Sequence, residues 1–206
     1  MNYRNEVILS GHIVENFKFH HFSGIKIFEG KIEIERRSGA KDVLILQISE
    51  RRLKETVSLE EGDGIIIFGE LRTYRYMGTD NKMHDKNYVY VERTCYTFNP
   101  DMTNQVKISG TIVKKGTLRI TQFGGKNVTE AIIASKSNNG YQHAYVPVIF
   151  WDEMAKEVFF NYKVGSEITI QGRFQSRDYV KKPKGGSAEL KTTFEVSTNR
   201  IILQNF

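Results

Sequence analysis

The chain contains two copies of one sequence unit. The segment from Asn5 to Val14 reads NEVILSGHIV, and the segment from Asn104 to Val113 reads NQVKISGTIV. Six of these ten aligned positions are identical, at an offset of 99 residues. Because about 100 residues is the usual size of a small domain, this repeat predicts two domains with the same fold.

The similarity continues along the chain, with an offset that grows slowly. Gly69 aligns with Gly172, and residues 86–91 align with residues 191–196. Each glycine falls inside a predicted strand, where a small barrel bends sharply and has no room for a side chain. The repeat therefore predicts strands that close into a barrel in both copies.

Each copy is expected to be all-β with one short helix. In the second copy the alternation of apolar residues predicts a helix and five strands: Asp152–Tyr162, and residues 106–113, 128–135, 145–150, 167–179 and 192–203. Five strands with a helix between the third and fourth is the order of an OB barrel. We therefore predict two tandem five-stranded OB barrels: a diverged N-terminal domain of residues 1–98, a linker of residues 99–103 and a C-terminal domain of residues 104–206.

The positive charge lies in the second copy. Residues 1–100 hold 15 Lys+Arg and 15 Asp+Glu, so the other 15 basic and 9 acidic residues give the whole net charge of +6. A basic domain favours a polyanionic partner. No membrane-spanning run and no signal-peptide pattern are found, and Cys95 is the single cysteine, so we expect a cytoplasmic protein without disulfides.

The candidate binding residues are basic and aromatic. Alternation along residues 167–179 places Arg173, Arg177 and Tyr179 on the polar strand face, which suits a phosphate chain and stacked bases better than a core. Tyr145 and Trp151 are further candidate stacking rings. The remaining candidates lie in loops and in the first copy: Lys136, Tyr141, Lys181, Lys182, Lys184, Arg72, Tyr74 and Tyr76.

The sequence predicts neither a metal site, nor a cofactor, nor an enzyme. His20 and His21 are adjacent and have no ligand spacing with the other histidines. A phosphate-binding glycine loop and a nucleophile motif are also missing from the sequence.

The second copy resembles the bacterial single-stranded DNA-binding protein family. The motifs that carry the resemblance are N-x-V-x-I-S-G-x-I from Asn104, V-x-V-x-F-W-x-x-M-A-K-x-V from Val146, the run Lys163–Tyr179 and T-T-F-E-V from Thr192. The first copy resembles the family more weakly. The resemblance implies sequence-tolerant binding of single-stranded DNA in replication and recombination, with the DNA wrapped over several OB domains.

The resemblance also implies unequal copies. Family stacking positions correspond to Tyr145, Trp151 and Tyr179 in the second copy, but to approximately Val43, Ser49 and Tyr76 in the first. Glu70 stands where the second copy has Arg173. The C-terminal copy is therefore the expected main DNA-binding unit, and the first copy is an auxiliary binder or an assembly module.

The quaternary structure and the biological setting are predicted as follows. We expect a homodimer with four OB domains, in which an exposed first strand pairs with the same strand of a neighbour. The family's acidic C-terminal tail is missing, since the chain ends IILQNF, and this favours a phage or mobile-element protein. Two alternatives stay open: a protein-docking module of a primosome or relaxosome type, and an RNA-binding protein.

Overall fold

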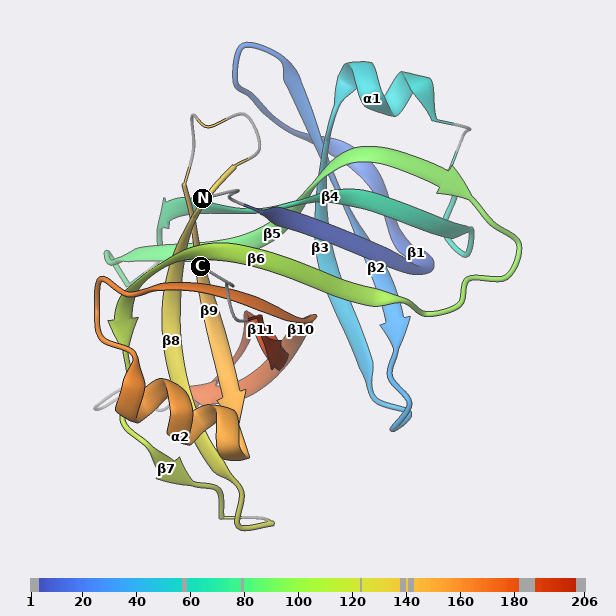
Figure 1. The fold of residues 1–206 in the computed structure, drawn as a ribbon. Helices are drawn as coiled ribbons and strands as arrows, with labels where there is room; N and C mark the ends of the chain where they lie inside the picture. Colours follow the sequence, from blue (N-terminus) through green and yellow to red (C-terminus); the bar gives the residue numbers. More distant parts are fainter. Residues whose placement is uncertain are drawn as a thin grey trace.

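The computed structural model describes residues 4–56, 59–78, 80–122, 124–137, 140, 143–181 and 188–202. These residues form an N-terminal half with five strands and one helix: β1 (Asn5–Phe22), β2 (Lys26–Glu35), β3 (Lys41–Ser49), α1 (Glu50–Glu55), β4 (Gly64–Met77) and β5 (Met83–Tyr96). The C-terminal half follows with β6 (Asn104–Lys115), β7 (Arg119–Ile120), β8 (Asn127–Lys136), β9 (His143–Trp151), α2 (Asp152–Asn161), β10 (Glu167–Lys181) and β11 (Glu189–Ile201). The two helices lie at opposite ends of the molecule (Figure 1). In this described part, neither helix has the length and apolar character needed to cross a lipid bilayer.

In each half the strand pairings form a closed ring. In the N-terminal half β1 pairs with β2, β2 with β3, β3 with β5, β5 with β4, and β4 with β1. In the C-terminal half the same order runs β6, β8, β9, β11, β10 and back to β6. Only β3–β5 and β9–β11 are parallel among these pairs. The predicted all-β, OB-type fold class is confirmed, while the domain boundaries at residues 99–103 stay a prediction.

An asparagine joins the first strand of each half to the fourth. The Asn5 side chain donates to Leu71 O at 2.9 Å and accepts from Leu71 N at 2.9 Å. Asn104 makes the same pair of contacts with Phe174, at 2.6 and 2.9 Å. Because equivalent residues make equivalent contacts, the repeat found in the sequence is also a repeat of tertiary structure.

Replacing Asn5 with alanine is expected to lower the free energy of unfolding by about 2 kcal/mol. The substitution leaves the N–H and C=O groups of Leu71 without these partners in a buried position. Urea unfolding followed by circular dichroism measures the loss. Asn99→Ala, at an exposed position, is the matched control, with an expected change below about 0.5 kcal/mol. Equal losses in the two variants would show that the side-chain contact does not matter.

The first strands of the two halves pair with each other. β1 and β6 are antiparallel, and Val7 lies opposite Val106 at the centre of the pairing. These two valines are equivalent in the repeat, at the offset of 99 residues. An antiparallel pair centred on equivalent residues places a local two-fold axis there, so the halves face each other in a nearly symmetric way (Figure 1).

The expectation of an exposed first strand is wrong. β1 pairs with β2 and β4 within its own half and with β6 of the other half. The repeat supplies within one chain the partner that we expected from a second chain. The predicted homodimer therefore needs a different surface.

The predicted alignment of the last strands is shifted by two residues. Val89 of β5 pairs with Leu46, and Val196 of β11 makes the equivalent pair with Val148. The structural offset is therefore 107 residues, whereas the sequence alignment used 105. A shift of two preserves the alternation of inward and outward side chains, so the hydrophobic pattern did not reveal the error.

Candidate nucleic-acid interface

The predicted residues of β10 lie on one outward face of the C-terminal half. Arg173, Arg177 and Tyr179 alternate along the strand, opposite Ser197, Thr193 and Lys191 of β11. Tyr179 is 40% exposed. The outward phase that the sequence predicted for these three side chains is confirmed.

Tyr145 and Trp151 extend the same face onto β9. They are six residues apart on a regular strand, so both rings point to the same side. Trp151 Nε1 donates to Ser197 Oγ at 3.1 Å, which places this side next to the outward residues of β11. Tyr145 is 43% exposed and Trp151 is half-buried. The structure therefore brings the three predicted rings of the second copy onto one surface.

The chain turns sharply directly after Trp151. Trp151 has an extended backbone, whereas Asp152, the first residue of α2, has a φ of 51°. Aspartate adopts this left-handed conformation more readily than most residues. After the turn α2 packs against β8 and β9 with Ala155 and Val158 in the core, while the indole of Trp151 stays bonded to β11.

The two arginines of this face are already engaged. Arg177 donates to both carboxylate oxygens of Glu195, at 3.0 and 3.1 Å, and this contact raises the pKa of Arg177. Arg173 donates to the side chain of Gln175 at 3.0 Å. Burial, and then the charge of nearby Arg36, lower the pKa of Arg173. A phosphate at Arg177 must therefore share the guanidinium with Glu195.

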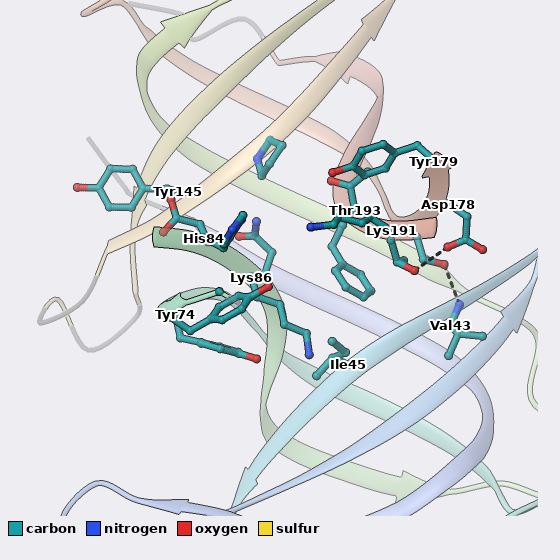
Figure 2. A pocket seen from close by; sticks show the side chains of 18 of the residues that line it. Val43, Ile45, Tyr74, His84, Lys86, Tyr145, Asp178, Tyr179, Lys191 and Thr193 are labelled. Carbon is teal, nitrogen blue, oxygen red and sulfur yellow. Dashed lines mark hydrogen bonds between the residues drawn. The ribbon is translucent and has the colours of Figure 1, made fainter. Parts of the chain in front are cut away.

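A cleft of about 870 Å³ separates the N-terminal half from this face. Its N-terminal wall includes Tyr74, Tyr76, His84 and Lys86, and its C-terminal wall includes Tyr145, Tyr179 and Lys191. Figure 2 shows Tyr145 and Tyr179 at opposite ends of the cleft, with Tyr74 and Lys86 on the facing wall. The cleft thus brings predicted residues of both copies to one place.

A smaller groove continues the cleft across the C-terminal half. It has a volume of about 240 Å³ and extends to Arg177 and Glu195. The cleft and the groove share Ile132, Pro147 and Thr193 as lining residues. The two hollows are therefore neighbours and offer one continuous surface to a long ligand.

The N-terminal wall carries more rings than the sequence analysis identified. The ring of Tyr74 lies 5.8 Å from Tyr76, 5.7 Å from Tyr88 and 6.0 Å from His20. Burial, reinforced by the charge of Glu29, raises the pKa of Tyr74 to about 12. His84 packs at 5.7 Å from Tyr76. The alternation of His84, Lys86 and Tyr88 along β5 was the sequence signal that could have found this cluster.

Arg72 is held within the N-terminal half. It donates to Glu70 at 2.7 Å, and its guanidinium carbon lies 3.5 Å from the ring centre of Tyr90. Glu70 is fully buried, at the position that corresponds to Arg173. Arg72 is therefore a weaker candidate for phosphate contact than its sequence position suggested, and its role stays a prediction.

Several lysines of the N-terminal wall also have acidic partners. Lys31 pairs with Glu15 at 2.7 Å, and Lys41 pairs with Glu33 at 2.7 Å. Lys86 lies 4.0 Å from Glu29. The Lys31–Glu15 pair is exposed, and such pairs are worth little in water, so a phosphate can replace this carboxylate at small cost.

The remaining predicted residues lie outside the cleft or outside the described residues. Lys136 is exposed at the end of β8. Lys181 ends β10, but its side chain is not among those described, and Tyr141, Lys182 and Lys184 also fall outside the described residues. Within the described part of the chain, no group of three His, Cys, Asp or Glu side chains is arranged to hold a metal ion.

Comparison with known proteins identifies the family. Residues 103–203 match the Single-strand binding protein family. Single-stranded DNA-binding protein 2 of Chlorobaculum tepidum is 30% identical over 109 residues, which are 50% of this chain and 71% of that protein. The chain belongs to the single-strand binding protein family. This is a family of DNA-binding proteins rather than enzymes, which confirms the expectation of a non-enzymatic protein.

Two solved structures share the fold of the whole chain. The wild-type single-stranded DNA binding protein of Thermus aquaticus has a TM-score of 0.76 and 17% identity, covering 100% of this chain and 95% of that one. A deletion mutant of the same protein has a TM-score of 0.74 and 18% identity, covering 99% and 97%. The similarity therefore includes the arrangement of the two halves.

Proposed function

We propose that this protein binds single-stranded DNA with little sequence preference and protects it during replication or recombination. The observation that carries the proposal is the outward face of the C-terminal half, where Tyr145, Trp151 and Tyr179 share one surface with two arginines. Rings stack on any base, because every base has a π-face, and each stack is worth about 1–3 kcal/mol. Family membership supports the same ligand.

The two halves have unequal parts in this proposal. The C-terminal half is the main binding unit, since it carries rings at Tyr145 and Trp151 where the N-terminal half has Val43 and Ser49. The N-terminal half is an auxiliary binder, because Tyr74 and Tyr76 face the same cleft. This assignment takes the halves as two OB domains joined by residues 99–103.

The proposal includes a homodimer, which would bring four OB domains together. The family resemblance supports the dimer. The edge of β1 does not, because it already pairs with β6 within the chain. Light scattering that gives the mass of two chains supports the dimer, and a strict monomer contradicts it.

Titration with oligo-dT tests the proposed function. Trp151 is the only tryptophan, and its ring lies on the proposed surface, so stacking is expected to quench its fluorescence. Binding is also expected to weaken as salt rises, because phosphate contacts release counterions. No quenching and no salt-dependent binding would overturn the proposal and favour a protein-docking module. Equal affinity for the matching RNA would favour an RNA-binding role.

Glu195→Gln is expected to strengthen oligo-dT binding by about fivefold. The substitution keeps an acceptor for Arg177 and Gln175 but removes a buried negative charge from the proposed phosphate path. Anisotropy of labelled oligo-dT measures the change. Glu153→Gln, which removes an exposed charge on α2, is the control with little expected effect. Unchanged or weaker binding in Glu195→Gln would mean that DNA does not pass Arg177.

A further inference from the structure

The edge of β9 near Tyr145 faces the other half of the chain. In the residues that the structure describes, β11 pairs with β9 only at Val148 and Ile149. Thr73 of β4 meets the backbone of β9 before this pairing. Tyr145 N donates to Thr73 Oγ1 at 2.9 Å, and Tyr145 O lies 3.2 Å from the same hydroxyl. A side chain of the N-terminal half, Thr73, thus forms a hydrogen bond with the β9 backbone at Tyr145 of the C-terminal half.

A residue of the N-terminal half, to which Thr73 itself belongs, orients the Thr73 hydroxyl. It donates to Asn87 Oδ1 at 2.7 Å. Asn87 lies opposite Thr73 in the β4–β5 pair and is 4% exposed. A hydroxyl has a single proton, so donation to Asn87 leaves an oxygen lone pair for Tyr145 N–H. The hydrogen bonds from Thr73 to Asn87 and from Tyr145 to Thr73 therefore form a continuous link between the two halves.

We propose that Thr73 is a positioning residue that holds Tyr145 for contact with single-stranded DNA. The proposal rests on the proposed function. Tyr145 is 43% exposed and lines one end of the cleft, where its ring points away from the other labelled side chains (Figure 2). Its direction depends on the strand backbone, and Thr73 fixes that backbone. The C-terminal half therefore depends on the N-terminal half for one of its rings.

The repeat supplies a matched control. Ser176 is equivalent to Thr73, at the offset of 103 residues, and its Oγ accepts from Val43 N at 3.0 Å. Val43 corresponds to Tyr145 but has no ring. The same hydroxyl-to-backbone contact thus occurs twice, once under a proposed stacking ring and once under an aliphatic side chain.

Three variants and one double-mutant cycle test the proposal, with anisotropy of labelled oligo-dT as the readout. Thr73→Val keeps the shape of the side chain but removes the hydroxyl, and is expected to weaken binding about fivefold. Thr73→Ser is expected to bind like the wild type, and Ser176→Ala to change affinity less than about twofold. In the background of Tyr145→Ala, Thr73→Val is expected to cause no further loss, since no ring is left to position.

Two results of the binding measurements overturn the proposal: a fivefold loss from Thr73→Val that persists in the Tyr145→Ala background, or an equal loss from Ser176→Ala. Amide hydrogen exchange provides a readout without DNA. The Tyr145 amide is expected to exchange faster in Thr73→Val and at the wild-type rate in Thr73→Ser, and an unchanged rate in Thr73→Val overturns the positioning role. A wild-type protein that does not bind oligo-dT overturns the proposed function, and exchange at Tyr145 then decides the positioning role separately.

Discussion

Alanine at both Trp151 and Tyr179 is expected to weaken oligo-dT binding by about 2–5 kcal/mol. The two rings lie on one outward face, Tyr179 on β10 and Trp151 at the end of β9 next to β11. If each stacks on a base, removing both costs at most the sum of two contacts of about 1–3 kcal/mol each. Anisotropy of labelled oligo-dT measures the loss, because the double variant has no tryptophan left to report it.

The repeat gives this prediction its control. Tyr76 is equivalent to Tyr179 and has nearly the same exposure, 43% against 40%. Tyr76→Ala is expected to cost less than Tyr179→Ala, because the positions that correspond to Tyr145 and Trp151 carry no ring in the N-terminal half. Equal losses would contradict the unequal roles of the halves. Urea unfolding of each variant separates a loss of binding from a loss of folding.

The part of the site that follows from local alternation was predictable from the sequence. Strands have a period of two, so the spacing of Arg173, Arg177 and Tyr179 is enough to assign them to a common face. The same holds for the glycines: a Cβ on Gly69 or Gly172 would collide with the carbonyl of Tyr90 or Ser197 on the neighbouring strand. Both features depend on a strand and its nearest neighbour alone.

The cleft was not predictable in this way. It exists because β1 pairs with β6 and brings the two outward faces together, and no local pattern specifies that pairing. The ion pair of Arg177 with Glu195 joins residues 18 positions apart, so it also depends on how the strands lie. The composition therefore predicted a face with more unpaired positive charge than the structure shows.

Replacing Asp42 with alanine is expected to lower the free energy of unfolding by about 3 kcal/mol. Asp42 is 1% exposed, pairs with Arg36, and accepts from Ser176 N of the other half at 3.0 Å. Its removal takes away the carboxylate that Arg36 bonds directly and leaves this guanidinium beside Arg173, and breaking a buried pair from one side costs several kcal/mol. Urea unfolding measures the loss.

A second substitution separates charge from packing in this result. If the loss comes from an uncompensated guanidinium, adding Arg36→Met to Asp42→Ala should restore much of the stability, because an apolar side chain carries no desolvation penalty. Asp85→Ala, which breaks the exposed pair with Arg75, should cost less than about 1 kcal/mol. A double variant no more stable than Asp42→Ala would instead assign the loss to the contact with Ser176. The junction between the halves would then depend on that backbone hydrogen bond rather than on the ion pair.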